Sequence, residues 1–343
     1  MKKEAYIQFK NLSISERLFK FVNNEILPGT KISSSNFWSG FSKTVHKLSK
    51  KNKKLLEKRE DLQIKINSYN KRIKGKKFQI KDYERYLYKI GYLIKKGKNF
   101  KINVKNVDDE ISKICGPQLV CPVSNSRFIL NAANARWVSL YDSLYGSDVI
   151  ESEESVSERY DPERGHEVRK YSKNFLDKFF PLNKNIHWKN VQNIKVEEGK
   201  LCLITYDSKC FLKNAKKFVG YRGEKNNPSA IILKNNNLHL EIIINPKAFS
   251  AKSDPAGISD IILESAITTI CDNEDSVAAV DSTDKVDCYR NWLGLMKKNL
   301  TSKFNKSGKI YYRKLNPDRK YFTPKGKQLK LYGRSLLLNR NVG

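Results

Sequence analysis

A short acidic cluster is the first part of this sequence whose residue types could do chemistry. Residues 270–281 read ICDNEDSVAAVD, and three carboxylates, Asp272, Glu274 and Asp275, fall within four positions. Carboxylates can act as general bases or help to hold cations, and Ser276 adds a hydroxyl group. The chain as a whole carries a formal net charge of +30, so acid is concentrated here against the general trend. The cluster is either a solvated turn or part of a functional site.

The composition is that of a folded protein with two or three domains. The chain has 343 residues, and 39% of them are hydrophobic. This length exceeds what one compact core usually holds, and this share of apolar residues argues against global disorder. No run approaches the ~18 consecutive apolar residues of a membrane span. The N-terminal segment lacks the apolar core of a secretory signal, so we expect a cytoplasmic protein.

The cysteines and histidines do not form a metal-binding pattern. None of the six cysteines belongs to a C-x-x-C pair, and the four histidines are scattered. A zinc site is therefore not expected. We expect the cysteines to be free thiols in a reducing compartment.

The positive charge is concentrated in the N-terminal part of the chain. Residues 1–100 hold 26 Lys and Arg against 8 Asp and Glu. Only 15 of the 66 basic residues are Arg, although base reading and bidentate phosphate recognition favour arginine. Two interpretations stay open: lysines on solvated helix faces, or a surface that binds a polyanion.

Periodicity predicts a helical N-terminal part and, after it, two α/β segments around a β-rich one. We expect His239 and Glu241 on the solvent face of their strand. The expected elements are a helix after a capping pattern at 13–16, a helix capped by Asn36, a lysine-rich helix, a helix over 83–90, a connector over 96–114, a strand in 116–124, a helix over 126–146, a loop over 147–165, hairpins over 194–206 and 230–245, helices over 258–268 and 283–296, and a hairpin pairing 309–315 with 327–333.

This order of elements predicts an insertion into an α/β barrel or a doubly wound sheet. In such folds the chemistry lies at the carboxyl ends of the strands. The acidic cluster lies where a short strand would end, and Arg340 follows the last apolar run in the same way.

Several long motifs are similar to the malate synthase family, in its G isoform. The similarity runs from residue 21 to residue 343 and includes GPQLV, LNAANARW, KFVGYRG, LHLEI, EDSVAAVD, YRNWLGLM, LNPDR and GRSLL. The resemblance implies a Claisen condensation of acetyl-CoA with glyoxylate that yields malate and CoA, with Mg²⁺ bound. This is a reaction of the glyoxylate cycle, which shares its intermediates with the tricarboxylic acid cycle.

The resemblance also implies the fold class and the domains. We expect the incomplete beginning of a TIM (β/α)8 barrel with an N-terminal α-helical clasp and an inserted β-rich α/β domain. The expected divisions are 1–95 for the clasp, 96–146 for the first barrel segment, 147–257 for the inserted domain, 258–296 for the second barrel segment, 297–333 for the remaining hairpin of the insertion, and 334–343 for a truncated barrel strand.

The resemblance assigns roles to particular residues. Arg340 matches the family's cation that contacts glyoxylate and stabilises the enolate oxygen. Asp272 and Glu274 match acids near Mg²⁺ that orient its ligands and waters without touching the metal; the alternative is acid at a helix N-terminus. The family's acetyl-CoA contacts match Val120, Arg127, Phe128, Ser276 and Arg313.

The family's catalytic aspartate and its two metal-binding carboxylates lie beyond the segment that corresponds to residue 343. We therefore expect a truncated chain with no metal ligand of its own and no activity alone. The full-length enzyme is expected to be a monomer that binds neither membranes nor nucleic acid. The alternatives are a basic polyanion-binding module and a non-catalytic relative.

Overall fold

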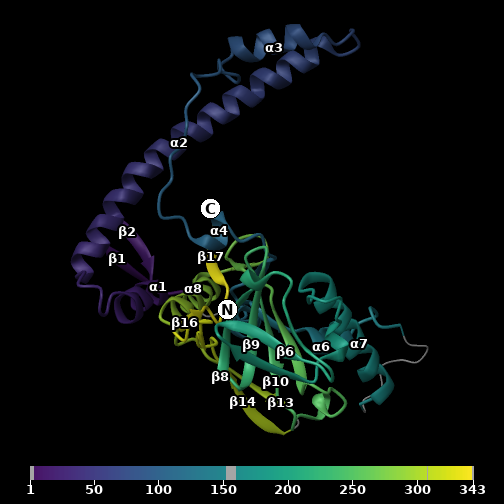
Figure 1. Ribbon diagram of the computed structural model, residues 1–343. Helices are drawn as coiled ribbons and strands as arrows, with labels where there is room; N and C mark the ends of the chain where they lie inside the picture. The colour runs from purple at the N-terminus through teal and green to yellow at the C-terminus, as the bar shows by residue number, and fades with distance from the viewer. Residues whose placement is uncertain (1–3, 152–159, 307, 342–343) are drawn as a thin grey trace. The chain divides into compact units, whose positions relative to one another are not determined.

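The computed structural model describes residues 4–151, 160–306 and 308–341 (Figure 1). The chain divides into two compact units, Met1–Asn106 and Val107–Gly343. In the described part of the chain, no helix is both long enough and apolar enough to cross a membrane.

The N-terminal unit combines a small hairpin with helices. Its described elements are β1 (Tyr6–Phe9), β2 (Leu12–Ser15), α1 (Glu16–Phe21), a π-helical turn (Val22–Ile26), α2 (Ser34–Ile73) and α3 (Ile80–Lys89). A small core surrounds Trp38, which is buried against Ile14, Val22 and Leu27. The indole Nε1 of Trp38 donates a hydrogen bond to Asn23 Oδ1 at 3.2 Å. This core joins the start of α2 to the hairpin.

One long helix replaces two that the sequence predicts. Helix α2 begins at Ser34, where the hydroxyl group of Ser33 accepts a hydrogen bond from the backbone N–H of Asn36. The expected cap at Asn36 was therefore wrong. The capping pattern at 13–16 was also wrong, because Ser13 lies in β2 and α1 has no side-chain cap. The helix over 83–90 is confirmed as part of α3, which packs against α2 through stacked tyrosine rings.

The C-terminal unit contains one parallel sheet and several antiparallel ones. Its described helices are α4 (Asp109–Ser112), α5 (Ser126–Asn134), α6 (Leu140–Tyr145), α7 (Pro162–Phe179) and α8 (Ser282–Met296), with 3-10 turns at Trp188–Asn190, Ala215–Lys217 and Phe249–Ala251. Its described strands are β3 (Gln118–Pro122), β4 (Trp137–Ser139), β5 (Asn193–Glu197), β6 (Lys200–Ile204), β7 (Lys209–Phe211), β8 (Phe218–Glu224), β9 (Asn227–Asn235), β10 (Leu238–Ile244), β11 (Ile258–Glu264), β12 (Thr268–Asp272), β13 (Ser302–Lys306), β14 (Lys309–Arg313), β15 (Arg319–Phe322), β16 (Gln328–Leu331) and β17 (Leu336–Arg340).

The larger sheet is antiparallel and has the order β16-β15-β8-β9-β10-β11-β4. One of its faces joins α6, α7 and the small sheet β5-β6-β7 in the main core, which buries Leu176, Trp188 and Leu203 completely. The strand in 116–124, the hairpins over 194–206 and 230–245, and the helix over 283–296 are confirmed. The mixed α/β class is confirmed with them.

Three predicted elements in this unit were wrong. Two were wrong because pairing between distant segments overrode local periodicity, and the third because each segment of the expected hairpin pairs with a neighbouring strand in the chain. Residues 258–264 form strand β11 between β10 and β4, where a helix was expected. Residues 126–146 form two helices separated by β4, because this short segment pairs with β11. The segments 309–315 and 327–333 do not pair; β14 pairs with β13, and β16 pairs with β15. The expected loop over 147–165 lies partly outside the described residues, and α7 begins at Pro162 after a cap by Asp161.

The expected solvent face of β10 was also wrong. Glu241 is fully buried between two arginines: Arg319 forms a short hydrogen-bonded ion pair with it, and Arg222 Nη2 lies 3.0 Å from Glu241 Oε1. His239 is largely buried against Glu264. These arginines come from β8 and β15 of the same sheet, so the polar alternation marks a buried ion cluster.

Replacement of Arg319 by Gln should lower the free energy of unfolding by about 3 kcal/mol, because it removes a partner from a buried carboxylate. Chemical denaturation at pH 7 checks this. Lys320→Gln changes the charge equally at an exposed position of the same strand and should leave stability nearly unchanged. Equal effects of the two substitutions would contradict the assignment.

Candidate functional site

The parallel sheet brings the predicted site residues to one edge. Its order is β17-β12-β3, and its register pairs Asp272 with Arg340 on one side and with Pro122 on the other. The three strands therefore end together. The prediction that the acidic cluster follows a strand and that Arg340 ends another is confirmed.

The two faces of this sheet differ. Leu119, Cys121, Cys271 and Leu337 point to one face and pack in a core with residues of α5 and α8. Because side chains alternate along a strand, Val120 lies on the opposite face, where 54% of it is exposed. The same alternation assigns Asp272 and Arg340 to this second face, on which Val120 is exposed.

Asp272 is the centre of the hydrogen-bond network at this edge. Arg340 donates from Nε to Oδ1 and from Nη2 to Oδ2, both at 2.8 Å. The backbone N–H of Glu274 donates to Oδ1 at 2.9 Å, and that of Ser276 donates to Oδ2 at 2.8 Å. The hydroxyl group of Ser276 donates to Oδ2 at 2.6 Å. A bidentate ion pair and a folded-back loop thus share one buried carboxylate.

The network fixes the charge of both partners. The hydrogen bonds from Arg340 hold the pKa of Asp272 well below its usual range, against the opposing effect of burial, and bonds from Ser276 and Glu274 add to the effect. Hydrogen bonding to Asp272 also raises the pKa of Arg340. Both groups are therefore ionised at neutral pH.

The other two acids lie farther from the guanidinium group. Glu274 Oε2 is 3.7 Å from Arg340 Nε, and Asp275 Oδ2 is 3.5 Å from Arg340 Nη1. A hydrogen bond with Asp275 raises the pKa of Glu274. About a third of the Arg340 side chain is exposed. Asp272 accepts from Nε and Nη2 of Arg340, so the exposed remainder of the guanidinium group can contact a ligand.

This arrangement bears on the metal. In the described part of the chain, no group of three or more His, Cys, Asp or Glu side chains could hold a metal ion. Asp272 accepts five hydrogen bonds, which fill the acceptor capacity of a carboxylate. Asp272 therefore has no acceptor capacity left to bind a metal ion directly. A role for Asp272 and Glu274 near a metal stays a prediction.

The expected acetyl-CoA contacts lie near the same edge or, for Val120, on the same face of the sheet as Asp272. Arg127 and Phe128 begin α5, directly after β3, and Phe128 is exposed. The hydroxyl group of Ser276 is directed to Asp272. Arg313 ends β14, where its guanidinium group lies 5.6 Å from the ring centre of Phe304. Arg127 lies 4.7 Å from the same ring.

Sequence reasoning missed Phe304. The incorrect hairpin assignment separated it from Arg313, whereas the observed register of β13 with β14 brings them to one place. The alternation of Phe304 with charged and polar neighbours was the available signal.

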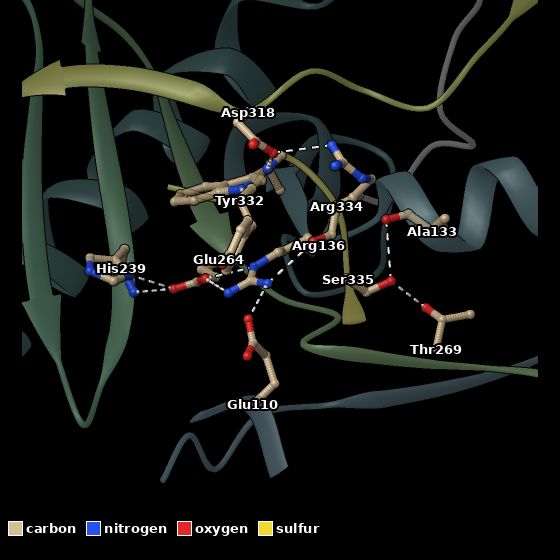
Figure 2. Close-up of polar contacts among 12 residues, drawn as sticks. Glu110, Ala133, Arg136, His239, Glu264, Thr269, Asp318, Tyr332, Arg334 and Ser335 are labelled. Atoms are coloured by element: carbon tan, nitrogen blue, oxygen red, sulfur yellow. Dashed lines mark hydrogen bonds and ion pairs between the residues drawn. The ribbon is translucent and has the colours of Figure 1, made fainter. Parts of the chain in front are cut away.

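A second polar cluster lies at the other end of the parallel sheet, where β17 begins (Figure 2). Arg136 is buried between Glu110 and Glu264, at 2.8 Å from each. His239 lies 2.7 Å from the second oxygen of Glu264. Burial acts to raise the pKa of Glu264, but the hydrogen bond from His239 and the charge of Arg136 outweigh it and lower the pKa. These residues border a cavity of about 720 Å³.

Comparison with known proteins identifies two domains. Residues 17–72 match the family model described as the malate synthase N-terminal domain. Residues 160–235 match the alpha-beta insertion domain of malate synthase G. These matches confirm an N-terminal malate synthase domain and an insertion domain.

Individual relatives extend the similarity to nearly the whole chain. Malate synthase G of Halalkalibacterium halodurans is 44% identical over 99% of this chain and 47% of its own length. The Corynebacterium glutamicum protein is 43% identical over 97% of this chain and 45% of its own. The Corynebacterium efficiens protein is 41% identical over 97% of this chain and 44% of its own length. The resemblance to malate synthase G is confirmed, and the chain spans about half the length of these relatives.

Asp272→Asn should lower the free energy of unfolding at pH 7 by about 1–3 kcal/mol, because it removes charge-assisted hydrogen bonds. The folded pKa of Asp272 lies below its ordinary value. Its stabilising effect is therefore present above about pH 4 and is lost as the pH falls toward the folded pKa.

Urea denaturation of both proteins between pH 7 and pH 2.5 measures this, and the difference between them should shrink below about pH 4. Asp275→Asn is the matched control, since Asp275 is exposed and its contact with Arg340 is long. A difference that stayed constant with pH would contradict the assigned pKa shift.

Proposed function

We propose that this chain, which is similar to malate synthase G over nearly its whole length, supplies the acetyl-CoA- and glyoxylate-binding part of a malate synthase, an acyl-CoA-dependent acyltransferase of the glyoxylate cycle. The observation that carries the proposal is the bidentate pair between Arg340 and Asp272 at the carboxyl ends of two parallel strands. Open strand ends are where ligands bind in parallel α/β folds.

The proposed reaction joins two carbon atoms. A base removes a proton from the methyl group of acetyl-CoA, and the resulting enolate carbon attacks the aldehyde carbon of glyoxylate. The aldehyde oxygen gains a proton, and water then hydrolyses the thioester to give malate and CoA. Negative charge develops on oxygen atoms in the carbon–carbon bond-forming step, so a fixed cation lowers its barrier.

In this proposal Arg340 binds glyoxylate and stabilises the developing oxyanion. A guanidinium group suits the task because it stays charged and offers several donors in one plane. Asp272 accepts from Nε and Nη2 of Arg340 and so fixes the plane of the group. We assign neither the base nor a metal ligand to the described residues.

The fold of the whole enzyme is part of the same proposal. We infer that β3, β12 and β17 begin a TIM (β/α)8 barrel, one strand in each of the segments 96–146, 258–296 and 334–343 expected from the sequence. Support comes from their parallel pairing, from the helices α5 and α8 on one face, and from the exposure of Val120 on the other. Strands β4 and β11 pair with the antiparallel sheet, so that sheet extends beyond 147–257. A monomeric, cytoplasmic enzyme is proposed on the resemblance.

Glyoxylate binding to the purified chain tests the role of Arg340. Calorimetry should detect binding, and Arg340→Lys should weaken it at least about tenfold, because a lysine keeps the charge but loses the bidentate geometry. Arg334→Lys, at an arginine that pairs with Asp318 away from this edge, should leave binding unchanged. Absence of glyoxylate binding by the unmodified chain would count against the proposal.

A separate assay concerns catalysis. Without an assigned base or metal ligand, the chain alone should release no free thiol from acetyl-CoA in the presence of glyoxylate. A thiol-reactive dye follows the release directly. Glyoxylate-dependent release above the blank would show that the described residues contain the missing groups.

A further inference from the structure

Two arginines share one aromatic ring at the edge of the parallel sheet. The guanidinium carbon of Arg127 lies 4.7 Å from the ring centre of Phe304, and that of Arg313 lies 5.6 Å from it. Both distances are within the range of cation–π attraction. The ring therefore holds two positive groups, from segments far apart in the chain, in one place.

The positive charge here is not neutralised in the described part of the chain. Neither Arg127 nor Arg313 forms an ion pair there. Residues 302–317 include five basic residues and no acidic one. Arg127 also lies in the first turn of α5, which contains no acid, and the helix dipole disfavours a cation at that end. Like charges brought together without a counterion indicate a site for an anion.

The hairpin β13-β14 positions the ring. Phe304 pairs directly with Tyr311, and their rings stack with centres 5.7 Å apart. The hairpin also packs against α5, which carries Arg127. Phe304 is half-buried between Tyr311 and α5. These neighbours hold its ring in place.

We propose that Phe304 is a positioning residue that holds Arg127 and Arg313 as a joint receptor for the phosphate groups of CoA. This rests on the proposed function and adds a residue that makes no direct contact with the reacting atoms. An aspartate or glutamate could also hold two arginines together, but it would neutralise them and occupy their N–H donors. An aromatic ring attracts the face of each guanidinium group and leaves its in-plane donors free for phosphate oxygens.

Calorimetric titration of the purified chain with CoA tests the proposal. Phe304→Leu keeps an apolar side chain and removes the aromatic face. It should weaken CoA binding about five- to thirtyfold, the effect expected for the loss of two partly exposed cation–π contacts. Phe304→Tyr keeps the ring and should retain binding within about twofold, since its face attracts cations similarly. Rescue by Tyr separates a role in cation positioning from simple packing.

The matched control is Tyr312→Leu. Tyr312 is an exposed aromatic residue of the same hairpin, and it pairs with Lys303 on the face opposite to Phe304. This variant should bind CoA as the unmodified chain does. The affinity for CoA should depend less steeply on salt concentration in Phe304→Leu than in the unmodified chain, because this substitution misplaces phosphate-binding cations. The salt dependence should be unchanged in Tyr312→Leu.

The possible results separate this proposal from the proposed function. If the unmodified chain binds CoA, and Arg127→Gln and Arg313→Gln weaken binding while Phe304→Leu does not, the role of Phe304 is overturned and the proposed function stands. Equal loss in Phe304→Leu and Phe304→Tyr also overturns it. If the unmodified chain does not bind CoA, both proposals fail. If Phe304→Leu does not fold, the CoA affinities of Phe304→Trp and Tyr312→Leu are compared instead. Phe304→Trp keeps an aromatic face and should bind CoA as Tyr312→Leu does; weaker CoA binding by Phe304→Trp contradicts the proposal.

Discussion

The ion pair between Asp272 and Arg340 is the interaction on which the arrangement of the candidate site depends. It joins the ends of two adjacent parallel strands, and the same carboxylate also binds the loop that follows β12. A buried carboxylate without a partner is costly, so its desolvation is offset only while the arginine stays in place. The parallel register makes the pair possible, and the pair fixes the plane of a guanidinium group that remains one-third exposed.

The two ends of the parallel sheet contain different kinds of polar cluster. At the carboxyl ends, the cations Arg340, Arg127 and Arg313 each keep donors that the described residues do not use. At the opposite end, Arg136 is enclosed by two glutamates and is almost completely buried. Exposed, incompletely bonded cations suit ligand binding, and an enclosed, saturated one suits the joining of secondary structure elements. This contrast supports placing the proposed chemistry at the end that carries Arg340.

Much of the site could be predicted from sequence, because its signals are local. The acids after one apolar run and an arginine after another both indicated strand ends, which the structure confirms. The roles that the long motifs imply for these residues stay predictions. Several of the errors arose where distant segments decide the outcome. Residues 258–264 became a strand because β10 and β4 flank them, and Glu241 became buried because Arg319 reaches it from β15. The contact of Phe304 with two arginines depends on a hairpin register that residue types alone did not reveal.

The central claim is that Asp272 holds the guanidinium group of Arg340 in a fixed orientation. Solvent exchange of the Arg340 Nε–H, followed by NMR of the arginine side chains, measures this directly. We expect slow exchange in the unmodified chain, protection that persists when glyoxylate is added, and fast exchange in Asp272→Asn. Exchange in the unmodified chain as fast as that of exposed arginine side chains would contradict it.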